Sequence, residues 1–224
     1  MHFLVFGATG KSSKPAVTGA CGSIFIETAH KEGHSIDLLA RPSSVIPQKL
    51  RLCCRKIIQG RLDDPEILRE AAESGADIFV SFAGPHHGQK GTPITDFYRQ
   101  FLPLLGTQHS KRVLILSTPS FTAPEDRPSW KWNIGSIFMK IFSGEQYEEM
   151  VQAGVFITSL SLQDVKWVLY RVGRLTDGAA QPVVTTFLGS GRDNMSISRS
   201  SVARWVLTES QQANWTGKAP YICN

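Results

Sequence analysis

The sequence lacks any apolar run that approaches the roughly 20 residues a membrane-spanning helix needs. Its first apolar stretch, residues 2–6, is too short for a secretory signal and runs straight into a glycine turn. Hydrophobic residues make up 42% of the chain and charged residues 19%, which is typical of a soluble globular protein. We therefore expect a cytoplasmic protein that does not enter a membrane.

Clusters of metal-ligating side chains are also missing. The four cysteines have neither metal-ligand nor redox spacing, and the adjacent pair is a poor disulfide candidate: Cys21, Cys53, Cys54 and Cys223. The neighbouring His86 and His87 point in different directions on an extended chain, and no third ligand is evident nearby. We expect reduced thiols, no metal site, and a histidine pair that is solvated or lies at a substrate rim.

Charge of one sign is not in large excess, since 24 Lys and Arg against 19 Asp and Glu give a net charge of +5. The basic residues are scattered rather than arranged in a stripe, which argues against a nucleic-acid partner. The mild positive charge favours the approach of an anionic cofactor. The chain has no internal repeat or linker, and its 224 residues fit one domain spanning 1–224.

The opening of the chain carries the strongest local pattern. Residues 2–6 form a short apolar run that ends at Gly7, which is typical of a buried parallel strand. Residues 23–33 repeat apolar side chains at helical spacing and stop at Gly33, a natural cap. A strand, a glycine turn and a helix together form the phosphate-binding corner of a dinucleotide fold, where bare backbone and a helix N-terminus approach a pyrophosphate.

Residues 11–19 interrupt this corner. Without them the chain would read Gly-Ala-Thr-Gly-Ala-Cys-Gly and continue directly into the helix. That phrase resembles the G-x-x-G-x-x-G signature of the atypical, extended-type short-chain dehydrogenases, especially their NmrA-like NAD(P)H-binding branch. We interpret Lys11–Gly19 as a nine-residue insertion in the nucleotide loop. A tight strand–helix turn that binds no nucleotide is the alternative.

Two later phrases extend the resemblance. Residues 165–178 resemble the end of the family's sixth strand and the substrate loop after it. Residues 193–203 resemble its "I-S-R-x-D-V-A" phrase, with Ser198 as the helix cap and Ser201 where Asp is usual. The resemblance implies a doubly wound α/β fold of the Rossmann type, with six or seven mainly parallel strands and helices on both faces. Residues from about 172 to 224 would add a small substrate cap.

The second predicted strand, residues 35–40, ends at Arg41. In a Rossmann unit an acid at this point binds the ribose 2′-hydroxyl, whereas an arginine accommodates a 2′-phosphate. No acid follows in the next turn, so NADPH is favoured over NADH, with a merely solvated arginine as the alternative. The resemblance implies further cofactor contacts from the diphosphate to the adenosine side: Gly7, Thr9, Gly10, Gly22, Asp63, Ala83 and Gly84.

Ser117 ends the clear strand 111–117, where dehydrogenases of this superfamily carry a serine beside the nicotinamide. Their usual partners are Tyr-x-x-x-Lys, in which tyrosine donates a proton and lysine lowers its pKa. Here Ser136 and Lys140 stand at a comparable distance, with serine in place of tyrosine. Ser117 and Lys140 are therefore the candidate catalytic residues. Lys140 is equally compatible with the surface of an amphipathic helix, which we expect over 137–153.

Residues 119–135 have no clean period and are rich in Pro, Ser, Trp and charge. They predict a mobile segment over the cofactor mouth, with Trp130 and Trp132 either as substrate walls or as loop anchors. The leading hypothesis is NADPH-dependent reduction of a small, largely apolar organic molecule. A non-redox isomerase or cyclase and a non-catalytic NAD(P)H sensor remain alternatives, because the usual tyrosine is absent.

Overall fold

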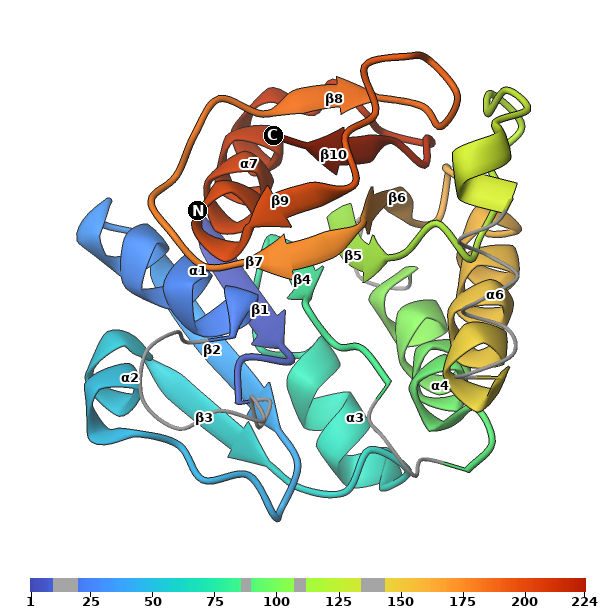
Figure 1. The fold of residues 1–224 in the computed structure, drawn as a ribbon. Coiled ribbons are helices and arrows are strands. Elements are labelled where there is room, and N and C mark those ends of the chain that lie inside the picture. The colour runs from blue at the N-terminus through green and yellow to red at the C-terminus, as the bar shows by residue number, and fades with distance from the viewer. Residues whose placement is uncertain (10–19, 86–89, 107–111, 134–143) are drawn as a thin grey trace.

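The computed structural model describes residues 1–9, 20–85, 90–106, 112–133 and 144–224. Within these ranges an eight-stranded sheet has the order β3-β2-β1-β4-β5-β6-β10-β8 (Figure 1). All neighbouring strands are parallel except β10 and β8. The bounds of its strands are β1 His2–Phe6, β2 Ser35–Ala40, β3 Lys56–Gln59, β4 Ile78–Ser81, β5 Arg112–Ser117, β6 Lys166–Val172, β8 Val184–Thr186 and β10 Tyr221–Cys223.

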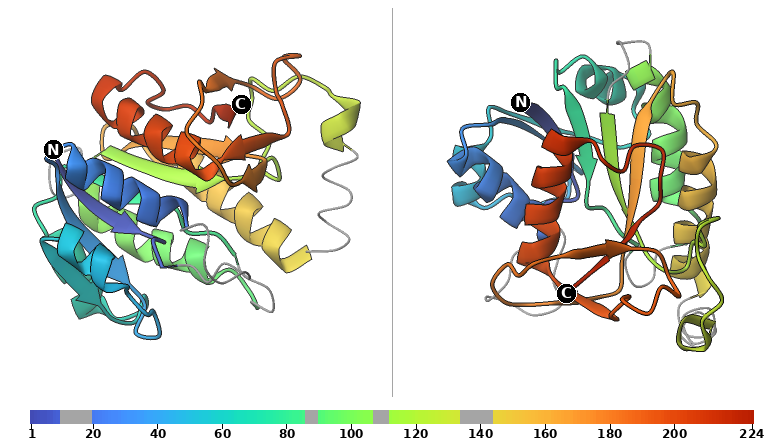
Figure 2. Two further views of the ribbon diagram at one scale, coloured as in Figure 1. Left: turned by 60° about the vertical axis from the view of Figure 1, so that its left-hand side comes forward. Right: turned by 90° about the horizontal axis from the view of Figure 1, so that it is seen from above.

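Helices cover both faces of this sheet, as Figure 2 shows from two further sides. Helices α1 and α7 pack on one face, and α3, α4 and α6 pack on the other. Helix α2 lies beside α1. The bounds of the helices are α1 Cys21–Lys31, α2 Gln48–Cys53, α3 Pro65–Ala72, α4 Pro93–Gly106, α6 Gly144–Thr158 and α7 Arg199–Gln212. The predicted doubly wound α/β fold is therefore confirmed.

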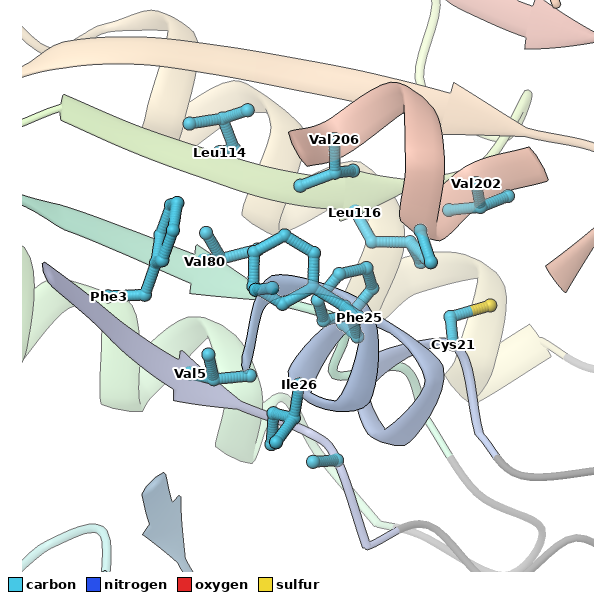
Figure 3. Packing of buried hydrophobic residues seen from close by; sticks show 14 of the residues in the cluster. Phe3, Val5, Cys21, Phe25, Ile26, Val80, Leu114, Leu116, Val202 and Val206 are labelled. Carbon is cyan, nitrogen blue, oxygen red and sulfur yellow. The ribbon is translucent and has the colours of Figure 1, made fainter. Parts of the chain in front are cut away.

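The alternation of side chains along β1 explains the two layers. Phe3 and Val5 point toward α1, where they meet Phe25 and Ile26 (Figure 3). Their neighbours Leu4 and Phe6 belong to the opposite core with the side chains of α3 and α4. A strand buried on both faces needs such an unbroken apolar run, because successive side chains project to opposite sides.

Two sheet features differ from the prediction. The main sheet has eight strands, not six or seven, because the three-residue strand β8 pairs with β10 at the edge. A separate two-stranded sheet joins β7 (Arg174–Thr176) to β9 (Ser196–Ser198). Strands β7, β8 and β9 all lie in the region predicted to form the cap, from residue 172 onward. Strands this short carry no readable alternation, so the sequence gives little sign of them.

Several helix boundaries match their sequence signals. Gly33 follows the cap of α1 with φ +80°, and the Ser198 hydroxyl accepts a hydrogen bond from the Ser201 N–H at the start of α7. The helix predicted over 137–153 is described from Gly144 and ends later, at Thr158. The segment Lys11–Gly19 lies outside the described residues. Within the described ranges, no helix combines the length and apolar character that crossing a membrane requires.

Candidate functional site

The turn after β1 is closely packed against two other segments. Gly7 has φ +84°, and a Cβ on it would lie 2.4 Å from the Ala83 nitrogen after β4. A Cβ on Gly22 would lie 2.8 Å from the Ala8 Cα, so helix α1 begins against the same turn. Both positions require glycine because backbone occupies the space a side chain would need. The two glycines bring the ends of β1, β4 and α1 together.

A cleft of about 150 Å³ opens at this point. It lies at the carboxyl ends of β1, β2 and β4, on either side of the position where the strand order reverses, which is where open α/β sheets bind ligands. Its lining includes five of the residues predicted to bind a cofactor: Gly7, Thr9, Arg41, Ala83 and Gly84. A Cβ on Gly84 would meet no atom within 4 Å, so this backbone borders open space.

A larger cavity of about 500 Å³ adjoins the cleft beyond Arg41. The two share Arg41, Leu62 and Pro93 in their linings, so they adjoin at these residues, and we call the two together the groove. Asp63 lies in the outer cavity, where its carboxylate accepts hydrogen bonds from Arg61 Nε at 2.9 Å and Nη2 at 2.6 Å. The hydrogen bonding from Arg61 holds the pKa of Asp63 below its usual value.

The turn that carries Arg41 is held by two side chains. Gln59 Nε2 on β3 donates to the carbonyl oxygens of Arg41 at 3.2 Å, Pro42 at 3.1 Å and Ser44 at 3.0 Å. The Thr9 hydroxyl donates to Ser44 Oγ at 3.0 Å. Thr9 therefore lines the cleft and also ties the turn after β1 to the turn after β2. Sequence reasoning missed Gln59, since a lone glutamine at a strand end carries no motif.

A buried hydroxyl network supports the floor of the cleft. Ser81 Oγ accepts from the Ala83 N–H at 3.2 Å and lies 2.7 Å from the Tyr98 hydroxyl. Tyr170 on β6 donates to the Ser81 carbonyl oxygen at 3.1 Å. Burial raises the pKa of both tyrosines well above the usual value. These protonated phenols hold Ser81, whose hydroxyl in turn accepts from the Ala83 N–H.

Helix α4 begins at the rim of the cleft with Pro93 and Ile94. Its first N–H groups have no partners within the helix, and the fully buried Glu149 of α6 accepts from two of them. The distances are 3.1 Å from Ile94 N and 2.9 Å from Thr95 N, with a further 2.5 Å bond from Thr95 Oγ1. A carboxylate 55 residues away in sequence thus caps α4, and no local signal in the sequence indicates it.

Ser117 ends β5 at the same edge of the sheet. The register of β5 against β4 pairs Ile115 with Ser81, which sets Ser117 level with the loop after β4. The side chain is buried, and its Oγ makes no hydrogen bond to any described residue. Ser117 is not among the residues that line the cleft or the outer cavity. Such an unpaired buried hydroxyl needs an explanation, and a bound ligand is one.

Four residues singled out in the sequence lie outside the described residues: Gly10, His86, His87 and Lys140. Their site roles stay predictions.

The described part of the segment after β5 is held by an ion pair with β6. Arg171 on β6 is fully buried, and its Nη1 and Nη2 donate to Asp126 at 2.5 and 2.7 Å. The Asp126 carboxylate also accepts from the N–H groups of Ala123 at 2.8 Å and Leu188 at 2.9 Å. This ion pair fixes the segment to the C-terminal part of the chain, a contact that local composition could not indicate.

The two predicted tryptophans have different roles. The Trp132 indole is buried and donates to Asp193 Oδ2 at 2.6 Å, which makes it a loop anchor. Hydrogen bonds from Gly189, Trp132 and Lys131 outweigh burial and lower the pKa of Asp193. Trp130, by contrast, is 78% exposed and is free to meet a ligand from solvent.

A glycine turn, a helix start and an arginine-bearing strand end, gathered where the strand order reverses, define a dinucleotide-binding protein of the Rossmann type. The residues fit a nucleotide, since backbone without side chains borders open space at Gly84 and hydrogen-bond donors border the groove at Arg41 and Arg61. The sequence model of the NAD(P)H-binding family matches residues 17–212. The chain belongs to this NAD(P)H-binding family, which confirms the resemblance seen in the sequence.

Solved structures support the same fold over the whole chain. ChuY, an anaerobilin reductase from Escherichia coli O157:H7, superposes with a TM-score of 0.72 at 16% identity, covering 100% of this chain and 97% of that one. A wide-type short-chain dehydrogenase/reductase from Veillonella parvula DSM 2008, in complex with NADP, gives 0.73 at 14% identity, covering 100% and 94%. A candidate NADH-flavin reductase from Streptococcus pneumoniae TIGR4 gives 0.67 at 15%, covering 100% and 99%. No curated protein matches the chain.

Proposed function

We propose that this protein is an NADPH-dependent oxidoreductase of the atypical short-chain dehydrogenase type, acting on a small, largely apolar organic substrate. The observation that carries the proposal is the groove at the strand reversal, which gathers Gly7, Thr9, Ala83 and Gly84 and ends at Arg41. Membership of an NAD(P)H-binding family supports it, as do an NADP-bound neighbour and a neighbour that is a reductase.

The chain's own residues would divide the binding task along the groove. Gly7, Thr9, Gly10 and Gly22 would hold the diphosphate, Ala83 and Gly84 would line the adenosine side, and Asp63 would lie near the adenine. Arg41 would pair with the 2′-phosphate, since a guanidinium matches phosphate geometry with a fork of donors. The Gln59 and Thr9 hydrogen bonds would pre-form the Arg41 turn and so lower the entropy lost on binding.

The chemistry needs alignment and a dry site more than a reactive side chain. When bound, the nicotinamide supplies the hydride. Ser117 would hydrogen-bond the reacting oxygen of the substrate through the hydroxyl that has no partner among the described residues. Lys140 would lie near the nicotinamide ribose. With no tyrosine at the usual place, water or a proton carried by the substrate would complete the reduction.

Turnover of purified protein tests the function directly. NADPH oxidation would be followed by absorbance at the nicotinamide band against panels of quinones, bilins, flavins and small carbonyl compounds. We expect oxidation of NADPH with at least one apolar acceptor, and the rate should fall on the order of 10²–10³-fold in the Ser117→Ala variant. Substrate conversion without any nicotinamide would instead identify an isomerase or cyclase. Tight NADPH binding with no conversion across all panels would identify a sensor.

A further inference from the structure

Two arginines that follow different strands line the outer cavity. Arg41 follows β2, and Arg61 follows β3, and both line the same space of about 500 Å³. This space adjoins the nucleotide cleft at Arg41, Leu62 and Pro93, which line both. A nucleotide in the cleft would therefore lie next to the space that both arginines line.

The backbones that carry these arginines are fixed to one another. The Gly60 N–H donates to the Ala40 carbonyl oxygen at 3.1 Å, which joins the ends of β2 and β3 directly before the two arginines. Gln59 holds the Arg41 turn from the same strand end. The separation of the Arg41 and Arg61 backbones is therefore fixed before a ligand binds. A preorganised anion site requires this.

The Arg61 guanidinium has a donor group that is not engaged by Asp63. Arg61 Nε and Nη2 donate hydrogen bonds to the Asp63 carboxylate, while Nη1 makes no hydrogen bond to a described residue. The ion pair is exposed, with side-chain accessibilities of 75% for Arg61 and 59% for Asp63. Exposed pairs of this kind are weak, so Arg61 can turn toward a phosphate dianion at little cost. The other acid in the lining, Asp96, is paired with Arg99 Nη1 at 3.2 Å.

We propose that Arg61 is a second phosphate-binding residue, so that Arg41 and Arg61 together form a two-guanidinium site for the 2′-phosphate of the nucleotide and determine cofactor specificity. This proposal rests on the proposed function, which assigns the adjoining cleft to NADPH. Asp63 acts in it as a restraint that holds Arg61 at the cavity mouth and that opposes the phosphate through its own negative charge. Arg61 thereby favours the nucleotide that carries a 2′-phosphate, and Asp63 weakens that preference.

The test uses adenosine 2′,5′-bisphosphate and 5′-AMP, which differ only in the 2′-phosphate, titrated calorimetrically into the full chain. Arg61→Gln should weaken binding of the bisphosphate about fivefold to tenfold and leave 5′-AMP unchanged, as expected for one lost charge-assisted contact. Asp63→Asn should strengthen binding of the bisphosphate several-fold relative to binding of 5′-AMP, because any contact with the adenine is common to both nucleotides. Arg69→Gln removes the same charge from an exposed pair on α3 outside the cavity and serves as the matched control.

Two results would overturn the proposal. In the first, Arg61→Gln and Arg69→Gln have the same affinity for the bisphosphate, and only Arg41→Gln fails to bind it. Arg41 would then bind the 2′-phosphate alone. In the second, Asp63→Asn changes the affinity for both nucleotides by the same factor. Asp63 would then act only on the part that they share and would not oppose the 2′-phosphate. A wild-type protein that does not distinguish the two nucleotides would instead contradict the NADPH assignment itself, so the two failures are distinguishable.

Discussion

Gly7 and Gly84 line the same cleft but differ in what a side chain would meet. A Cβ on Gly7 would contact the backbone of the loop after β4, whereas a Cβ on Gly84 would project into open space. Gly7→Ala should therefore destabilise the fold by about 2–4 kcal/mol, because it adds a clash to a left-handed backbone. Urea unfolding measures this change in the free energy of unfolding.

Gly84→Ala should leave the free energy of unfolding within about 0.5 kcal/mol of wild type. It should nevertheless weaken NADPH binding about tenfold or more, because the methyl group occupies the space predicted for the nucleotide. Fluorescence titration with NADPH measures the second effect. Equal affinity in Gly84→Ala and wild type would mean that the nucleotide does not approach this backbone.

Ser117 combines burial with an unpaired hydroxyl, a combination that stability alone does not explain. Ser117→Ala should leave the folded state as stable as wild type or slightly more so, because it removes a polar group without a partner among the described residues. Turnover should fall on the order of 10²–10³-fold with NADPH affinity unchanged, as for the loss of one donor to a reacting oxygen.

Ser120→Ala is the control for Ser117→Ala, since it removes a hydroxyl three residues later in the same segment. Steady-state rates at saturating NADPH, combined with thermal melts, separate the two effects. An unchanged kcat in Ser117→Ala would show that the serine only ends the strand.

At the scale of elements, α6 caps α4 through Glu149 at the rim of the cleft. Glu149→Gln keeps the side-chain shape but removes the charge that strengthens these bonds, so it should lower the free energy of unfolding by about 1–3 kcal/mol. NADPH binding should weaken too, because Pro93 and Ile94 line the cleft. Urea unfolding and NADPH titration measure both effects. The control is Glu148→Gln, which changes an exposed neighbouring residue on α6. Equal effects of the two substitutions would contradict this role.

The Arg171–Asp126 pair joins β6 to the segment after β5 in a fully buried environment. Arg171→Met should destabilise the protein by about 3–5 kcal/mol, because it leaves the Asp126 carboxylate buried without its cation. Adding Asp126→Leu to that variant should recover part of the loss, since no uncompensated charge then remains. Arg174→Met on β7 removes the same positive charge from an exposed site, so it serves as the control for the loss of charge itself. Strictly additive losses, measured by urea unfolding, would show that the two side chains are not energetically coupled.

For the whole molecule, the sequence could predict most of the sheet and much of the cleft. Apolar runs predict the strands at 2–6, 35–40 and 77–83, and these runs end in glycine, arginine or small residues. In the structure the ends of these strands form the cleft. Parallel strands ending at one edge bring such residues together without any long-range information.

The supporting residues could not be predicted, because their roles depend on partners far away in the chain. Glu149 reaches a helix 55 residues earlier, and Asp193 holds a tryptophan 61 residues earlier. Gln59 is an ordinary polar residue until β2 and β3 lie side by side. The short strand β8 was missed for a similar reason, since its pairing with β10, rather than its three residues, defines it.

The central claim is that this groove binds NADPH in preference to NADH through Arg41. Parallel titrations of both nucleotides into wild type and Arg41→Ala test it most directly. Loss of the charge-assisted contact should cost about 1.5–3 kcal/mol for NADPH and little for NADH, so wild type prefers NADPH and the variant loses that preference. Wild-type protein that binds both nucleotides equally, or an Arg41→Ala variant that weakens both by the same factor, would contradict the account.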